Sequence, residues 1–282
     1  MAGRRVVVAC CQVPLSIEDP AGNRRLLTDA VERAASDGAN IVVLPELAST
    51  GYRFERPREL EAVAERADGE TIREWHRLAS EHDLVIVGGF VEAGQDGVFH
   101  NSAAVVDASG LRAIYRKAHL WDRESEWFAS GADAPAVVDT RFGRIGVVIC
   151  YDLEFPEWVR MAALAGTDIL CAPVNWPLFP RPNGERPAEV VKVQADAAVN
   201  RIYIAACDRA GTERGTQWLG GSVIVDADGF PLTELCLGAV GTIMAAIDVA
   251  EASDKSIGDR NNVFGDRRPE LYRGLQITTA GN

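Results

Sequence analysis

The feature that most constrains the fold is a pair of short segments that are apolar at every position, Ile41–Leu44 and Val147–Ile149. A strand with one face in water alternates apolar and polar residues, whereas a strand covered on both faces is apolar throughout. Both segments are therefore predicted to be strands buried between other layers. This arrangement is typical of α/β proteins, in which helices cover the sheets.

Strand-like and helical patterns alternate along the chain. About ten runs rich in β-branched residues predict strands, at Arg5–Val13, Ile41–Pro45, Leu84–Val91, Ser102–Val106, Ala113–Arg116, Arg144–Cys150, Asp168–Val174, Arg201–Cys207, Ser222–Val225 and Thr242–Val249. Segments with helical periodicity, each opened or closed by Pro or Gly, predict helices at Asn23–Ser36, Thr71–Glu81, Pro156–Ala165 and Pro187–Asn200. The order of elements predicts an α/β fold.

Two stretches also have patterns that predict β-hairpins. Ala104–Ile114 turns at Asp107–Gly110, and Ser222–Leu232 turns at Asp226–Gly229. Hairpins join antiparallel strands, so the sheets are predicted to be mixed.

The chain of 282 residues carries no fixed-period repeat, low-complexity tract or linker-like change of composition. Large α/β folds reach this length around one core, so a single domain over residues 1–282 is predicted. The proline-rich stretch Pro177–Pro187 is interpreted as a loop rather than a boundary. Long loops in compact domains often carry function, so this one is expected to shape a pocket.

The formal net charge is -12, and the sequence contains no run rich in Lys and Arg that could form a basic patch. Nucleic-acid binding is therefore not expected, and the acidity is interpreted as a source of solubility. The apolar run Val6–Cys11 ends at Gln12, too short for a signal peptide, which needs about 7–15 apolar residues. No stretch approaches the ~20 apolar residues of a membrane helix. We expect a cytoplasmic protein that is not bound to a membrane.

One cysteine stands apart from the others. Cysteines occupy positions 10, 11, 150, 171, 207 and 236, without a CxxC pair, and are expected to be reduced thiols. Five of them lie in or beside apolar runs, where cysteine is usually a small buried hydrophobe. Cys150 instead ends the strand Ile145–Ile149 and precedes a helix that Pro156 can begin. Such a strand-to-helix turn exposes a nucleophile.

A thiol with an ordinary pKa is mostly protonated at neutral pH, so a nucleophilic Cys150 needs a base or a cation nearby. Glu46 lies at the end of an apolar strand. Side chains at strand ends line the ligand crevices of α/β sheets. Lys117 follows another strand and is one of only three lysines, at positions 117, 192 and 255, among 29 basic residues. A lysine kept in an arginine-rich chain suggests a site that needs a compact ammonium.

Three segments carry a resemblance to a known family: Leu44–Glu46 with Gly51-Tyr52 after it, Tyr115–Leu120, and Gly146–Glu157. Together they resemble the nitrilase-like carbon–nitrogen hydrolases, and the likeness extends over nearly the whole chain. The tail Asp266–Tyr272 is also similar to the C-terminal ending of that family. Three motifs in the family's order are far more specific than any one of them.

The resemblance implies a four-layer αββα sandwich with two mixed β-sheets. It implies that Glu46 is the general base, that Lys117 stabilises the oxyanion and that Cys150 is the nucleophile. A second glutamate belongs to this pattern; we choose Glu124 because an Arg-Glu pair follows the His-Leu motif, and Glu126 remains an alternative.

The resemblance also places Tyr52, Asn175 and Trp176 near the substrate, and the Tyr151 N–H beside the oxyanion. For Tyr52 and Trp176 an ordinary role in the core or at an interface is an equal alternative. The four histidines show no metal-ligand spacing, so neither a metal nor a cofactor is expected. A homodimer or a larger homo-oligomer is predicted from the family.

The segment Cys150–Glu157 resembles the small-amide hydrolases. The predicted reaction cleaves the C–N bond of a small linear amide to a carboxylic acid and ammonia through a thioester acyl-enzyme. An N-carbamoyl amino acid or amine hydrolase and a nitrilase are the alternatives within the family. An inactive binding module with the same fold is the alternative of another class, and a thiol reagent that labels Cys150 would distinguish an enzyme from it.

Overall fold

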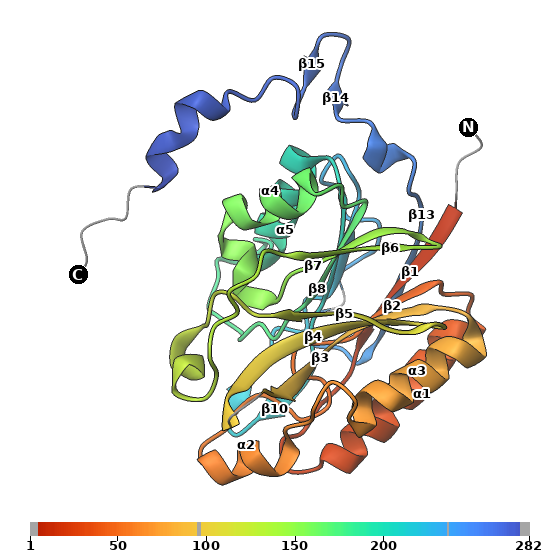
Figure 1. The fold of residues 1–282 in the computed structure, drawn as a ribbon, viewed down its shortest axis with the longest axis vertical. Coiled ribbons are helices and arrows are strands. Elements are labelled where there is room, and N and C mark those ends of the chain that lie inside the picture. Colours follow the sequence, from red (N-terminus) through yellow and green to blue (C-terminus); the bar gives the residue numbers. More distant parts are fainter. Residues whose placement is uncertain (1–4, 95–96, 236, 277–282) are drawn as a thin grey trace.

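Two β-sheets packed face to face form the centre of the structure, with helices on both outer faces (Figure 1). The computed structural model describes residues 5–94, 97–235 and 237–276. The four layers run helix, sheet, sheet, helix, so the predicted αββα sandwich is confirmed.

The first sheet has six strands in the order β13-β1-β2-β3-β4-β5. Its members are β1 (Arg5–Gln12), β2 (Ile41–Val43), β3 (Val85–Ala93), β4 (Phe99–Asp107), β5 (Gly110–Arg116) and β13 (Gly241–Asp248). β2 pairs in parallel with β1 and β3, and the remaining pairs are antiparallel. The sheet is therefore mixed, as predicted.

The second sheet has five strands in the order β12-β9-β8-β7-β6. Its members are β6 (Ala136–Thr140), β7 (Gly143–Val147), β8 (Ile169–Pro173), β9 (Tyr203–Cys207) and β12 (Val223–Val225). The three central strands are parallel, and both edge strands pair antiparallel to their neighbours. Parallel central strands bring their carboxyl ends to one edge of the sheet, where ligand sites usually form.

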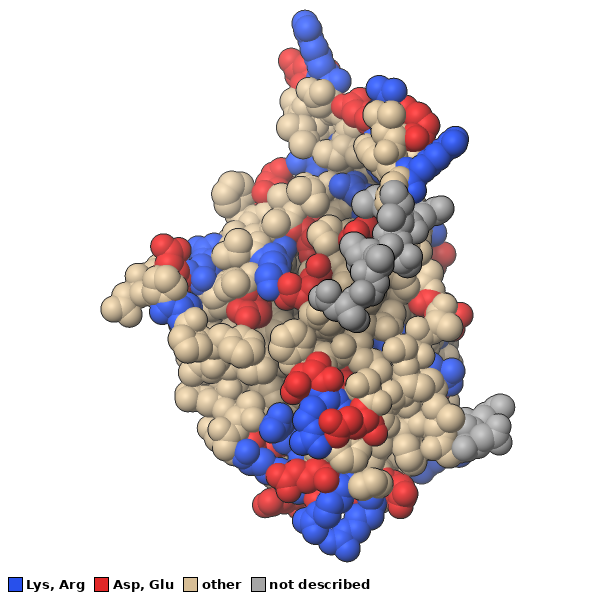
Figure 2. Space-filling view, turned by 90° about the vertical axis from the view of Figure 1, so that its left-hand side faces the viewer, with Lys and Arg blue, Asp and Glu red and all other residues tan. Residues whose placement is uncertain are grey.

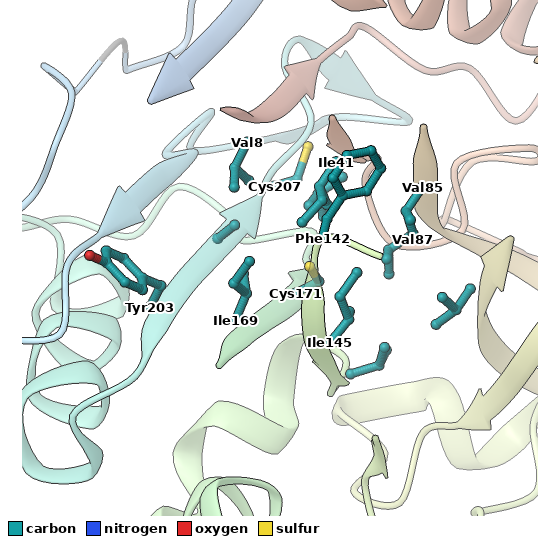
Figure 3. Close-up of a cluster of buried hydrophobic side chains, with 14 of the residues drawn as sticks. Val8, Ile41, Val85, Val87, Phe142, Ile145, Ile169, Cys171, Tyr203 and Cys207 are labelled. Carbon is teal, nitrogen blue, oxygen red and sulfur yellow. The ribbon is translucent and has the colours of Figure 1, made fainter. Parts of the chain in front are cut away.

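The side chains of one strand divide between two apolar cores. In β2, Ile41 and Val43 point between the sheets, whereas Val42 faces the outer helices. Figure 3 shows the inter-sheet core, with Ile41 and Val85 from the first sheet opposite Ile169 and other residues of the second. The unbroken apolar run at Ile41–Leu44 thus reflects burial on both faces of the strand.

The outer layers consist of helices with one buried face each. α1 (Pro20–Ser36) and α3 (Glu70–His82) cover the first sheet, and α4 (Pro156–Leu164) and α5 (Ala188–Asn200) cover the second (Figure 1). The predicted helices begin and end within a few residues of these bounds.

Among the α-helices and the strands of the two main sheets, two were not predicted: α2 (Pro57–Val63) and β6. Both are short, and β6 is a partly exposed edge strand, so neither has a long periodic pattern. The hairpin predicted at Ala104–Ile114 is formed by β4 and β5. The one at Ser222–Leu232 is only partly formed, because its second arm holds one isolated bridge between Val225 and Pro231, and proline cannot donate to a ladder.

Several short elements complete the described chain. They are the pairs β10 (Thr212–Glu213) with β11 (Thr216–Gln217) and β14 (Ser256–Ile257) with β15 (Asn261–Asn262), and the 3₁₀ helices η2 (Asp122–Glu126), η3 (Cys150–Glu154), η4 (Glu251–Ser253) and η5 (Pro269–Gln276). In Figure 1 the segment from β14 to η5 lies outside the layered body.

Charged side chains of both signs are interspersed on the face shown in Figure 2. Among the described residues, no helix is long and apolar enough to span a bilayer. The cysteines at 10, 11, 171 and 207 are buried free thiols, as predicted, and Cys236 lies outside the described residues.

Candidate active site

The structure brings together three side chains that the sequence places at separate strand ends. Glu46 and Lys117 follow strands β2 and β5 of the first sheet, and Cys150 follows β7 of the second. Lys117 Nζ lies 2.7 Å from Glu46 Oε1, and both side chains are completely buried. Without water to solvate them, these charges must satisfy each other.

Glu124 completes an arrangement of two carboxylates around one ammonium. It lies in η2, where its Oε1 accepts hydrogen bonds from Lys117 Nζ at 2.8 Å and from the Tyr52 hydroxyl at 2.6 Å. Its Oε2 accepts one from the Trp121 N–H at 2.9 Å. Glu126 instead lies in solvent, paired with Arg123 at 2.7 Å. The structure thus places Glu124, and not Glu126, beside Lys117.

Cys150 is the first residue of η3 and has φ of 44°, in the left-handed region that non-glycine residues rarely adopt. Its thiol is half-buried, and Sγ lies 3.8 Å from the Asn175 carbonyl oxygen. Strained backbone of this kind clusters at functional sites, where the surrounding structure holds it in place.

Asp152 supplies that support. Its buried carboxylate accepts hydrogen bonds from the Ile149 N–H at 2.9 Å and from the Tyr115 hydroxyl at 2.7 Å. The other carboxylate oxygen accepts from the His119 N–H at 3.1 Å and lies 2.7 Å from His119 Nδ1. Asp152 therefore ties the turn that carries Cys150 to the segment that carries Lys117.

Asn101 is a site residue that the sequence reasoning missed. It is fully buried in β4, and its Nδ2 donates to Glu46 Oε1 at 2.7 Å and to Glu124 Oε1 at 3.4 Å. Its backbone carbonyl accepts from the Lys117 N–H at 2.9 Å. An asparagine next to the apolar stretch Ala103–Val106 of the same strand was the available signal, because a buried amide needs polar partners.

The local electrostatics keep the thiol protonated and the carboxylate ready to receive a proton. Burial raises the pKa of Glu46 to about 7, against the lowering effect of Lys117. Burial alone would lower the pKa of Lys117, but the charges of Glu124 and Glu46 raise it above its ordinary value. Burial, and then the charge of Glu46, raise the pKa of the Cys150 thiol well above its usual range. Glu46 Oε2 accepts no hydrogen bond from any described residue.

Two adjoining cavities open onto these groups. One of about 340 Å³ is lined by Cys150, Tyr151, Asn175 and Trp176, and one of about 300 Å³ is lined by Tyr52 and Glu124. The two share Trp121, Pro177 and Phe179 as lining residues. The first part of the loop Pro177–Pro187 therefore shapes both cavities. Among the described residues, no group of three His, Cys, Asp or Glu side chains could hold a metal ion.

Two buried acids support the cavity walls from behind. Asp208 accepts hydrogen bonds from the Trp176 N–H at 3.0 Å and from the Gly221 N–H at 2.9 Å. Glu213 accepts one from the Tyr52 N–H at 3.0 Å and forms a buried ion pair with Arg209 at 3.1 Å. The sequence reasoning missed both, although Asp208 directly follows a predicted strand, as Lys117 does.

Glycine at position 89 allows the strand β3 to approach the turn that carries Glu46. A Cβ atom at this position would lie 2.3 Å from the Leu47 backbone nitrogen and 2.7 Å from the Glu46 Cα. Such contacts are too close for any side chain, so Gly89 fixes how deeply Glu46 sits beneath the cavity.

Comparison with known proteins finds members of one family that match this chain over nearly all of its length. The family model described as carbon-nitrogen hydrolase matches residues 7–255. A protein of Pyrococcus abyssi named nitrilase is 36% identical over 270 residues, which cover 95% of this chain and 99% of that protein. The 2-oxoglutaramate amidase of Bacillus subtilis is 30% identical over 275 residues, covering 94% and 98%.

Solved structures share this fold over nearly the whole chain. An amidase from Nesterenkonia sp. superposes with a TM-score of 0.81 at 27% sequence identity and covers 98% of each chain. In a structure of a mutant of the amidase from Nesterenkonia sp. AN1, acrylamide has added to the active-site cysteine.

Proposed function

Because the chain belongs to the carbon–nitrogen hydrolase family, we propose that it cleaves the C–N bond of small linear amides, releasing a carboxylic acid and ammonia through a thioester on Cys150. The observation that supports this most directly is the buried group of Glu46, Lys117 and Glu124 next to a thiol at a cavity wall. A nucleophile, a base and a fixed cation are the parts that acyl transfer requires.

The first step is attack of the Cys150 sulfur on the amide carbon. Since the thiol is protonated at rest, its proton moves to the unpaired Oε2 of Glu46 as the S–C bond forms. Negative charge then develops on the amide oxygen, where the Lys117 ammonium and the Tyr151 N–H stabilise it. The Tyr151 N–H lies in the first turn of η3, where helix N–H groups have no acceptor within the helix.

The second step releases ammonia and the third hydrolyses the thioester. Glu46, now protonated, gives its proton to the leaving nitrogen, and the C–N bond breaks. Glu46 then accepts a proton from the water that attacks the thioester, and it returns this proton to the sulfur as the C–S bond breaks, which frees the carboxylic acid and restores the thiol. Glu124 holds Lys117 in place during both steps.

Hydrolysis of N-carbamoyl compounds or nitriles would use the same nucleophile, so a substrate panel decides between these reactions. Ammonia release is measured from short aliphatic amides, matching nitriles and N-carbamoyl amino acids, and the intact mass is recorded after a rapid acid quench. We expect release from the amides together with a mass increase that equals the acyl group. Release from nitriles or carbamoyl compounds alone would reassign the substrate class, and the absence of any adduct would contradict the thioester route.

We expect kcat/KM to rise with pH and to level off above about pH 7. The base must be ionised to take the thiol proton, and the pKa of Glu46 is raised to about 7. Each pH unit below that value therefore reduces the rate roughly tenfold. The measurement is kcat/KM for one amide between about pH 5.5 and pH 8.5, a range that brackets the pKa of the free enzyme.

The variant Asn101→Leu provides the control for this assignment. The hydrogen bond from Asn101 lowers the pKa of Glu46, so its removal should move the rise in kcat/KM to higher pH. If the profile falls across this range, or stays in place in Asn101→Leu, Glu46 is not the titrating base.

A further inference from the structure

Arg53 is a cation without a counterion in the wall of the smaller cavity. It follows Tyr52, is half-buried and lines the same cavity of about 300 Å³ as Glu124. Within the described residues, its guanidinium forms no hydrogen bond, ion pair or ring contact. A partly desolvated guanidinium with five donors favours an anionic partner.

The backbone of Arg53 is fixed although its side chain has no partner. The Arg53 N–H donates to Glu213 Oε2 at 2.9 Å, and the Arg53 carbonyl accepts from Arg214 Nη1 at 2.7 Å. Glu213 is buried and paired with Arg209, so this anchor is rigid. The structure thus fixes the backbone that carries the guanidinium to the cavity wall, so that binding need order only the side chain.

The other charged groups of this cavity are paired or exposed. Glu124 shares the Lys117 ammonium with Glu46, and Arg123 is paired with Glu126. Asp122 is exposed, so water screens its charge far more than that of Arg53. Of the cationic residues that line this cavity, Arg53 alone has no carboxylate partner among the described residues.

We propose that Arg53 binds a carboxylate on the acyl chain of the substrate, so that the preferred substrates are monoamides of short dicarboxylic acids. This inference rests on the proposed function, because the amide end of such a molecule must reach Cys150 in the adjoining cavity. The planar guanidinium matches a carboxylate with two parallel hydrogen bonds. The two small cavities, which share lining residues, suit a chain of a few carbons between the two ends.

The test compares acidic and neutral amides of equal length. kcat/KM is measured for the monoamides of the four-, five- and six-carbon dicarboxylic acids and for the corresponding alkyl amides. In the natural protein we expect the acidic member to be preferred at one of these lengths. In Arg53→Met the ratio of acidic to neutral kcat/KM should fall about 10- to 100-fold, as expected for the loss of a hydrogen-bonded charge pair.

Two further variants separate recognition from folding. Arg53→Glu should invert the preference, so that an amide of equal length with a terminal ammonium replaces the acidic one as the better substrate. Arg58→Met removes an exposed arginine of α2 outside the cavity and should leave the ratio unchanged. An equal ratio for the natural protein and Arg53→Met, or no inversion in a folded Arg53→Glu variant, would overturn the proposal.

The inference and the proposed function can fail separately. If no amide of either series is hydrolysed, the proposed function fails, and binding of the five-carbon dicarboxylate is then measured by calorimetry. Weaker binding to Arg53→Met than to the natural protein still supports the carboxylate site. Equal binding, or none to either protein, overturns it. If neutral amides are hydrolysed as well as acidic ones at every length, only the Arg53 proposal fails.

Discussion

Replacing Cys150 with alanine should reduce amide hydrolysis by about 10⁴- to 10⁶-fold, the range that loss of a catalytic nucleophile produces in hydrolases of this kind. In the proposed mechanism the sulfur forms the only covalent bond to the acyl group, and no other described thiol lines either cavity. The measurement is ammonia release at saturating amide, together with the intact mass after an acid quench. The alanine variant should show neither turnover nor an acyl adduct.

Cys171→Ala is the matched control. Cys171 is also a free thiol of the second sheet, but it is completely buried in the inter-sheet core. Its removal should cost some stability and leave the acyl adduct intact. A folded Cys150→Ala protein with more than a few per cent of the natural rate would remove Cys150 from the mechanism.

Lys117→Met should reduce both activity and stability. In the proposed mechanism the ammonium stabilises the oxyanion, and loss of such a donor typically lowers kcat about 10²- to 10³-fold. Methionine has a similar length, so packing is nearly preserved. The two carboxylates of Glu46 and Glu124, however, lose the cation that compensates them. Breaking a buried pair in this way costs about 3–5 kcal/mol.

The stability loss in Lys117→Met should depend on pH. Lys117 lowers the pKa of Glu46, so its removal raises that pKa above about 7. A group whose folded-state pKa is raised binds protons more tightly in the folded state, so its contribution to stability falls as pH rises. Urea unfolding should therefore show a larger loss at about pH 8 than at about pH 5.

Arg77→Met serves as the stability control, since the ion pairs of Arg77 with Glu32, Glu74 and Glu81 lie at the protein surface. Its loss should cost about 1 kcal/mol or less at either pH. A Lys117→Met protein as stable as Arg77→Met, with the natural rate, would show that the buried ammonium has neither role.

The layered fold and the convergence of three side chains could be predicted because both follow from local patterns. Unbroken apolar runs indicate strands buried on two faces, and the polar residue that ends each run marks the sheet edge. Glu46 and Cys150 each end such a run, and Lys117 follows the mixed strand Ala113–Arg116. Motif resemblance then supplied what spacing could not, namely which of many strand-end residues belong together.

Contacts between segments far apart in the sequence could not be read in the same way. Asn101 acts from within a strand, and its partners depend on the register of β4 with β5. Glu124 and Glu126 differ only in the face of a short 3₁₀ helix that each occupies, which no periodicity reveals. Asp208 and Glu213 support the site through backbone N–H groups of distant loops, a pairing that only the folded chain defines.

The protonated resting state of Cys150 has a consequence outside the reaction. Hydrogen peroxide and general alkylating agents attack thiolates, and the oxidation of cysteine to sulfenic and higher acids follows thiolate character. Burial and the charge of Glu46 raise the pKa of the Cys150 thiol, so little thiolate forms in the resting protein. The enzyme should therefore tolerate oxidants that inactivate thiolate hydrolases, whereas electrophiles built on an amide scaffold should inactivate it rapidly.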